Sequence, residues 1–182
     1  PASVNFALKV PDGTSIVLEG SNYLQSGRLG SCYGVLCDGD LTIEGSGTLT
    51  ALGTPNFMSL ADQSVCYGIY ATGTVTIQNG ATVIAESTGA TSDSSGIAAG
   101  SVVISNSKVY ANSAESAMGV CGGIYATGDI SISDSTVIAP RGIYASGDVT
   151  LSQSSVHAFG SKIMVSDEFF YYGIYGDNVT IN

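Results

Sequence analysis

The sequence has few charged residues, and very few of these are basic. Charged residues make up 11% of the chain, and five Lys and Arg stand against fifteen Asp and Glu, which gives a formal net charge of −10. This excess of negative charge repels phosphate backbones and argues against nucleic acid as a partner. Where helical proteins solvate their surfaces with Lys, Glu and Arg, this chain has Ser, Thr, Asn and Gly, which is typical of a β-protein with outward-facing Thr and Ser.

Long apolar runs and histidine are also scarce. No stretch approaches the roughly 20 apolar residues of a membrane-spanning helix, and no signal peptide is evident, so we expect no membrane insertion. The single His and the absence of CxxC pairs argue against a zinc cluster. The chain starts at Pro1 and stops at Asn182 within a strand pattern, so we expect it to be a trimmed piece of a longer or processed protein.

One motif repeats along the chain from residue 34 onward. Its clearest copies read GIYATGTVTIQNGATVIAES from Gly68 and GIYATGDISISDSTVIAP from Gly123. Each copy contains three short runs in which apolar and polar residues alternate, the signature of strands with one buried face, and turn residues separate these runs. Further copies begin at Gly34, Gly96, Gly142 and Gly173.

Strands of three or four residues cannot pair across such turns within one copy, but each can pair with its equivalent in the next copy, about 4.8 Å away. The sequence therefore predicts an all-β fold, a single-stranded parallel β-helix (β-solenoid) of about six coils, with three short sheets around an apolar core. The usual handedness of parallel crossovers predicts right-handed winding. All insertions follow the third strand, at 54–66, 88–94, 112–121 and 160–171, so long loops are expected on one edge.

Alternation also assigns side chains to the core. Thr76, Ser131 and Thr150 are expected to point outward, and the aliphatic residues on either side of each to point inward, where each contributes roughly 1.5–3 kcal/mol by burial. The inward set of the second strand is Val75, Ile77, Ile130, Ile132, Val149 and Leu151, together with Ile104 and either Val102 or Val103.

The first 33 residues follow the repeat only loosely. We expect residues 1–33 to form a degenerate first coil or an N-terminal cap, continuous in one domain with the solenoid of residues 34–182. A cap is needed because an open end exposes unpaired strand edges and apolar side chains. The C-terminal end shows no such cap, so we expect more protein or another molecule to cover it.

Four cysteines, Cys32, Cys37, Cys66 and Cys121, are present. Three of them stand two residues before a glycine of the repeat, and equivalent positions predict an inward column. Two interpretations fit: small buried thiols, or a disulfide between Cys32 and Cys66 in adjacent coils.

The GIYATG segment with its following strands resembles the right-handed β-helix modules of the pectate-lyase-like superfamily. It looks more closely similar to repeats of secreted bacterial proteins described as carbohydrate-binding-domain-containing. The resemblance covers about residues 34–182 and concerns the fold more than the activity, because solenoid motifs record packing rather than chemistry. It implies a secreted or cell-surface bacterial protein with a polysaccharide or glycan as partner.

Enzymes of that superfamily act on acidic polysaccharides, by elimination with a basic residue beside calcium-binding carboxylates or by hydrolysis with a carboxylate pair. Asp40, Asp129 and Asp148 share one repeat position, and Asp129 and Asp148 are expected about 5 Å apart in consecutive coils. We expect each Asp to cap its own turn and face water, with a shared calcium ion or a catalytic pair as alternatives. Arg141 is the one basic residue in a repeat coil near these acids, and we expect it to be a solvated corner residue.

The single histidine, His157, falls at an outward strand position equivalent to Ile84, Tyr110 and Ile138. No Ser or Cys nucleophile is tied to it by sequence, so we expect an exposed residue without a catalytic role. No catalytic or metal-binding residue is assigned, and no cofactor is expected beyond the calcium alternative.

A column of tyrosines is the candidate ligand-binding site. Stacked at about 4.8 Å, outward-facing tyrosines offer flat apolar faces with hydroxyls at the rim, as sugar-binding sites do. The alternative is purely structural stacking, since Tyr is a favoured strand residue. The four candidates are Tyr70, Tyr125, Tyr144 and Tyr175, with Leu36 and Ala98 at the same position in other coils, and the loop edge adds Phe57, Met58, Phe169, Phe170, Tyr171 and Tyr172.

Three functions fit these features. The first is a non-catalytic module of a secreted or cell-surface bacterial protein, which binds glycans or serves as a stalk. The second is a polysaccharide lyase or glycoside hydrolase that uses Asp129, Asp148 and Arg141, and the third is a self-assembling structural segment. The lack of a catalytic set and the polar Thr and Ser surface favour the first.

Overall fold

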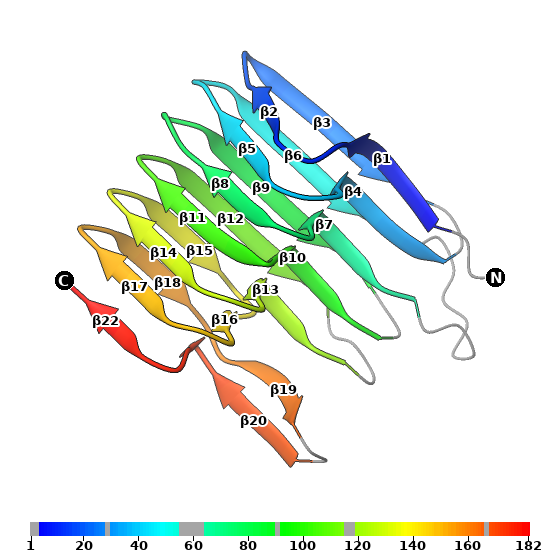
Figure 1. Cartoon of the computed structure of the whole chain (residues 1–182). Coiled ribbons are helices and arrows are strands. Elements are labelled where there is room, and N and C mark those ends of the chain that lie inside the picture. The colour runs from blue at the N-terminus through cyan, green and yellow to red at the C-terminus, as the bar shows by residue number, and fades with distance from the viewer. Residues whose placement is uncertain (1–3, 28–29, 55–63, 90–91, 115–118, 166–167) are drawn as a thin grey trace.

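The chain winds into a parallel β-helix whose three sheets run the length of the molecule (Figure 1). The computed structural model describes residues 4–27, 30–54, 64–89, 92–114, 119–165 and 168–182, without the side chains of 161–171. Within these residues there is no helix long and apolar enough to cross a membrane.

Each sheet collects one strand from every coil. The first sheet contains β1 (Val4–Val10), β4 (Ser31–Cys37), β7 (Cys66–Ala71), β10 (Ser94–Ala99), β13 (Cys121–Ala126), β16 (Ile143–Ala145) and β21 (Ile174–Tyr175). The second contains β2 (Thr14–Val17), β5 (Leu41–Glu44), β8 (Thr74–Ile77), β11 (Ser101–Ser105), β14 (Ile130–Ser133), β17 (Val149–Ser152) and β22 (Val179–Ile181). The third contains β3 (Ser21–Ser26), β6 (Thr48–Gly53), β9 (Thr82–Ser87), β12 (Lys108–Ser113), β15 (Thr136–Ala139) and β18 (Ser155–Ala158).

All pairings within the three sheets are parallel and join equivalent strands of successive coils. Six complete coils result, followed by a partial seventh made of β21 and β22. The predicted three-sheet parallel β-helix of about six coils is confirmed.

Matched aliphatic side chains fill the space between the sheets. In the first sheet Ile97 pairs with Ile69 on one side and Ile124 on the other, and all three are fully buried. The second sheet settles the choice that the sequence left open, because Val102 is fully buried whereas Val103 is 36% exposed. Each coil thus stacks on the next through its own aliphatic residues, which explains how strands of two to seven residues form a stable stack.

The third-sheet strands end, and the first-sheet strands of the next coils begin, along one edge of the molecule, where the sequence predicts the long insertions to start and finish (Figure 1). The first-sheet strands begin earlier than expected, at Cys66 and Cys121, two residues before the repeat glycine. The expected loop at 160–171 is instead an antiparallel hairpin of β19 (Ser161–Val165) and β20 (Glu168–Tyr172). The two strands of this insertion carry the apolar runs 163–165 and 169–172, and they pair with each other rather than with a strand of a neighbouring coil.

One corner after the third sheet is tight. The Gly142 N–H donates a hydrogen bond to the Ala139 carbonyl at 2.9 Å, and Gly142 has a φ of 76°. Glycine adopts this left-handed conformation without steric cost, which explains how β15 connects to β16 without an insertion.

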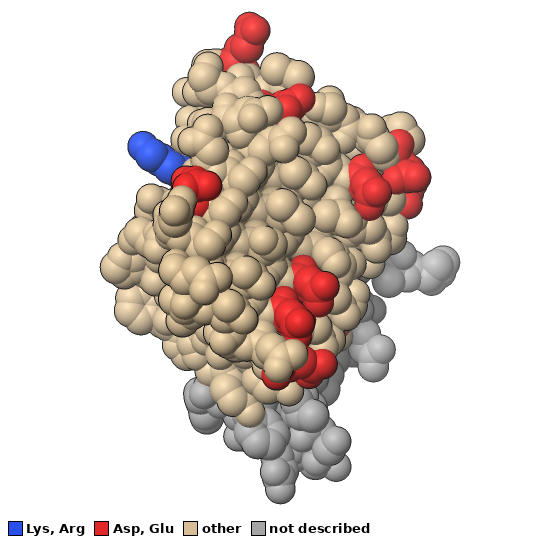
Figure 2. Space-filling view, turned by 60° about the vertical axis from the view of Figure 1, so that its left-hand side comes forward, with Lys and Arg blue, Asp and Glu red and all other residues tan. Residues whose placement is uncertain are grey.

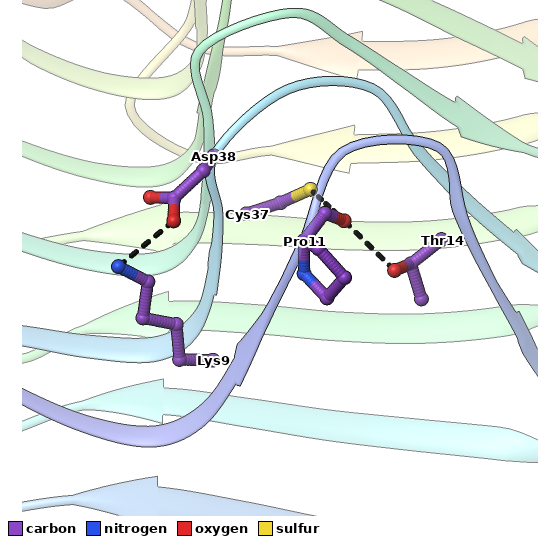
Figure 3. Close-up of polar contacts among 5 residues, drawn as sticks. All are labelled: Lys9, Pro11, Thr14, Cys37 and Asp38. Atoms are coloured by element: carbon purple, nitrogen blue, oxygen red, sulfur yellow. Dashed lines mark hydrogen bonds and ion pairs between the residues drawn. The ribbon is translucent and has the colours of Figure 1, made fainter.

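The first coil has all three strands, and β1, β2 and β3 pair with β4, β5 and β6. Side chains near its first corner hold it to the second coil (Figure 3). The Lys9 Nζ lies 2.8 Å from the Asp38 Oδ2. The Pro11 carbonyl accepts hydrogen bonds from the Cys37 Sγ at 3.4 Å and from the Thr14 Oγ1 at 2.8 Å.

Candidate ligand-binding face

The outer face of the first sheet carries the column of residues that the repeat placed in register. Tyr70 pairs with Ala98, and Ala98 pairs with Tyr125. Tyr125 then pairs with Tyr144, and Tyr144 with Tyr175. The isoleucine before each of Tyr70, Tyr125 and Tyr144 is buried in the core, so strand alternation turns the tyrosine itself outward. We call this set, with Leu36 at its start, the tyrosine column.

Its C-terminal half is a regular stack. The ring centroids of Tyr125 and Tyr144 are 5.4 Å apart with an interplanar angle of 9°, and those of Tyr144 and Tyr175 are 4.8 Å apart at 5°. Tyr172, at the end of the hairpin, packs on Tyr175 at 4.9 Å with a tilt of 48°. The stack repeats at nearly the strand spacing, and such pairs stabilise by roughly 0.5–1.5 kcal/mol beyond their burial.

The N-terminal half is a compact cluster that sequence reasoning missed. Tyr33 and Tyr67 pair in register beside the tyrosine column. The Tyr67 ring lies 5.1 Å from that of Tyr70, and the Tyr33 ring lies 5.7 Å from both, with interplanar angles between 30° and 69°. The Cys-Tyr dipeptide that precedes both Gly34 and Gly68 was the available signal in the sequence. We call Tyr33, Tyr67 and Tyr70 the N-terminal tyrosine cluster.

Burial controls the chemistry of these hydroxyls. Burial raises the pKa of Tyr67 strongly, and the negative charge of Asp93 raises it further. Burial also raises the pKa of Tyr33 and of Tyr125, with smaller contributions from neighbouring tyrosines and, for Tyr125, from Asp93. These phenols therefore stay protonated well above neutral pH and are able both to donate and to accept hydrogen bonds.

Asp93 was not among the candidates from sequence. Its Oδ1 accepts a hydrogen bond from the Val120 N–H at 2.9 Å, which holds the carboxylate just before β10. From there its charge reaches both Tyr67 and Tyr125. Asp93 gives this part of the first sheet a negative electrostatic character.

A hollow of about 210 Å³ separates the two halves of the tyrosine column. Tyr67 and Tyr70 form one wall, Tyr125 lies on the opposite side, and Ala98 belongs to its lining. Thr72 and Thr127, both exposed, also line it, and the Thr127 Oγ1 donates a hydrogen bond to the Gly100 carbonyl at 3.4 Å. No charged side chain is among the described residues that line it. The hollow exists because coil four has Ala where its neighbours have Tyr.

The turn aspartates cap the following coil, so the prediction that each caps its own turn is wrong. The Asp40 Oδ1 accepts a hydrogen bond from the Thr74 N–H at 2.7 Å, and the Asp129 Oδ1 accepts one from the Asp148 N–H at 2.9 Å. The Asp148 Oδ1 accepts one from the Asn178 Nδ2 at 2.7 Å. Parallel stacking aims the N–H of each turn at the carboxylate of the previous coil, so these carboxylates tie coils together.

The residues proposed for catalysis do not converge. Arg141 lies at the corner between the third and first sheets, whereas Asp148 lies beyond β16 at the next corner of the coil. His157 is exposed and pairs with Ile138, as predicted. In the described parts of the chain, no three His, Cys, Asp or Glu side chains group as metal ligands do.

All four cysteines are buried, and none is in a disulfide bond. Cys32 and Cys66 pair in register, as the repeat predicted. A hydrogen bond with Cys32, together with burial, raises the pKa of the Cys66 thiol strongly. The interpretation as buried thiols therefore describes this structure.

No protein-family model, no curated protein and no solved structure matches the chain. The protein is thus a three-sided parallel β-helix that carries the tyrosine column on the outer face of its first sheet. The similarity to pectate-lyase-like modules stays a prediction from the repeat motif. Of the residues predicted at the loop edge, Phe57 and Met58 lie outside the described residues, as do the side chains of 169–171.

Proposed function

We propose that the chain is a non-catalytic module that binds a glycan on the outer face of its first sheet, within a secreted or cell-surface bacterial protein of the pectate-lyase-like type. The observation that carries this proposal is the tyrosine column with the hollow in its middle. Tyrosine rings supply flat apolar contact area, and their hydroxyls hydrogen-bond at the edge, which suits the alternating C–H and O–H surfaces of sugars.

The charge distribution supports a neutral glycan. Figure 2 shows acidic side chains in small groups on a surface that is otherwise mostly uncharged, and the net charge of the chain is −10. An acidic polysaccharide would approach this surface against electrostatic repulsion. Thr72 and Thr127 at the hollow and the protonated phenols beside it suit uncharged hydroxyl partners.

The arrangement of charged residues favours binding over chemistry. A lyase of the predicted type needs a base close to its carboxylates, yet Arg141 and Asp148 stand at different corners of the coil. The carboxylates of Asp129 and Asp148 also accept hydrogen bonds from the next coil. These contacts support a scaffold role for Asp40, Asp129 and Asp148, which we call the aspartate ladder.

A glycan array followed by calorimetric titration tests the proposal. We expect binding to at least one neutral polysaccharide and a loss of about tenfold or more in affinity for the double variant Tyr125→Ala, Tyr144→Ala. Tyr110→Ala is the matched control, because Tyr110 is also a partly exposed outward tyrosine but lies on the third sheet. If no glycan binds, or if Tyr110→Ala weakens binding equally, the proposed function is wrong and the stalk function replaces it.

A further inference from the structure

The tyrosine column lacks one ring, at coil four. Ala98 pairs with Tyr70 on one side and with Tyr125 on the other, so these two tyrosines lie two strand spacings apart, roughly 9.6 Å. In the same coil Ser95 pairs with Tyr67, and Ser95 pairs in turn with Gly122. Both outward positions of coil four are therefore small.

We infer that the hollow over Ala98 is the principal subsite of the proposed glycan site and holds a single pyranose ring between Tyr70 and Tyr125. This inference rests on the proposed function. Carbon atoms in optimal contact lie roughly 3.5–4.0 Å apart, so one ring between two aromatic walls requires roughly 7–8 Å plus its own pucker. Two strand spacings supply that width, whereas the single spacing between Tyr125 and Tyr144 does not.

The volume of the hollow limits the occupant to one ring. Pockets for drug-sized ligands measure roughly 300–1,000 Å³, and this hollow measures about 210 Å³. Ala98 is only 2% exposed, because the larger side chains beside it shade it. The sugar ring therefore lies between the outer halves of Tyr70 and Tyr125. The neighbouring sugars of the glycan extend along the protein surface.

The two aromatic walls select the configuration of the sugar. A ring held on both faces must present apolar C–H groups on both faces, which a β-glucose residue does because all of its hydroxyls are equatorial. An axial hydroxyl, as in mannose or galactose, would point at a tyrosine face and lose its hydrogen bond to water. Thr72 and Thr127, at the edge of the hollow, are placed to meet equatorial hydroxyls.

The electrostatics of the site select against an anionic sugar. The described lining residues carry no charge, and the negative charge of Asp93 acts on both Tyr67 and Tyr125. A uronate carboxylate would be repelled here without a cation to balance it. The occupant is therefore a neutral β-linked glucan, with cellohexaose as the practical probe.

The direct test fills the gap. Ala98→Tyr places a ring where neighbouring coils already have one, so the fold accommodates it, and we expect its affinity for cellohexaose to fall about tenfold or more. Ala98→Ser leaves the hollow open and should stay within about twofold of wild type. Circular dichroism and thermal melting of each variant verify the fold.

A second pair of variants separates the subsite from the rest of the face. Tyr70→Ala removes a wall of the hollow, and Tyr175→Ala removes a ring of the same column that does not line it. We expect Tyr70→Ala to weaken cellohexaose binding about tenfold and Tyr175→Ala to weaken it less, by about two- to threefold, because neighbouring sugars of the glycan chain also contact the column. Mannohexaose and a β-1,4-galactan hexasaccharide should bind at least about tenfold more weakly than cellohexaose.

The outcomes distinguish this inference from the proposed function. If Ala98→Tyr binds cellohexaose as well as or better than wild type, while Tyr125→Ala with Tyr144→Ala still abolishes binding, the continuous stack is the site and the subsite is wrong. Equal binding of all three hexasaccharides overturns the selectivity for equatorial hydroxyls. Absence of binding to every glycan overturns both proposals.

Discussion

The inner and outer columns of the first sheet follow opposite rules. The inner column is aliphatic throughout, and Ile69, Ile97 and Ile124 are fully buried in matched positions. The outer column changes from Tyr70 to Ala98 to Tyr125 over the same coils. Packing against the other two sheets fixes the inner column. The outer column is not packed between sheets, so its side chains can differ from coil to coil. That variation can serve ligand binding.

Truncation inside the core should cost the most. Ile124→Ala removes a fully buried side chain and should lower the free energy of unfolding by about 2–5 kcal/mol. Tyr144→Ala, in the outer column of the adjoining coil, should cost less, about 1–3 kcal/mol, because its ring is only partly buried and its contribution comes chiefly from its two stacked neighbours. Chemical denaturation followed by circular dichroism compares them, and equal losses would erase the distinction between the two columns.

The second-largest effect is expected from alkaline pH, which should lower the stability of the protein through Tyr67 in the N-terminal tyrosine cluster. The folded pKa of Tyr67 is raised, whereas a tyrosine in the unfolded chain has a pKa of about 10. Above that pH the unfolded state binds fewer protons than the folded state, so stability is full below about pH 10 and declines as pH rises further.

The measurement is the unfolding midpoint between neutral pH and pH 11. Tyr67→Phe should flatten the decline, since Phe carries no ionisable group. Tyr23→Phe is the control, because Tyr23 is 63% exposed, and it should keep the wild-type slope. A wild-type slope in Tyr67→Phe would show that this buried phenol does not govern the alkaline limit.

The aspartate ladder should contribute about as much as a helix cap. Asp129→Ala removes the acceptor for the Asp148 N–H and should cost about 1 kcal/mol, by analogy with N-cap deletions. Asp129→Asn keeps an oxygen acceptor and should cost less. The urea unfolding midpoints of the two variants measure these costs. Identical midpoints for Asp129→Ala and Asp129→Asn would mean that the inter-coil hydrogen bond adds nothing to stability.

The smallest effect is expected at Glu44 on the second sheet. Hydrogen bonds from Gln78, Asn79 and Ser15 lower the pKa of this partly exposed carboxyl. A lowered folded pKa adds stability above the unfolded value, about 4.3, and this contribution is lost as pH falls through the folded pKa. NMR titration should give a Glu44 midpoint below that of an unperturbed glutamate, and this midpoint should move upward in Gln78→Ala. An unmoved midpoint would contradict this cause.

The repeat made most of the fold predictable. A period-two pattern in matched copies determines which face is buried, so the registers of Tyr70, Tyr125 and His157 followed directly. The hairpin β19–β20 did not follow, because an insertion between coils has no repeat to compare with. The direction of the Asp129 hydrogen bond depends on stacking between coils, which a pattern within one copy does not contain.

The candidate site was only half predictable. Alternation predicted the tyrosine column but not Tyr67, because residues three apart in a regular strand face opposite sides, whereas the rings of Tyr67 and Tyr70 lie together, 5.1 Å apart. Ala98 looked like a missing member of a column, and only the three-dimensional arrangement of Tyr70 and Tyr125 around it makes a hollow. Asp93 precedes its strand and acts through space, so no motif marks it.

An NMR titration of the isotope-labelled protein with cellohexaose tests the central claim most directly, because it reports on every coil and every face at once. The account predicts that amide shifts concentrate at Tyr67–Thr72, Ala98–Gly100 and Tyr125–Thr127, while the buried isoleucines of the distant coils stay unchanged. Shifts centred on Tyr110 and the third sheet, or none at saturating sugar, would contradict it.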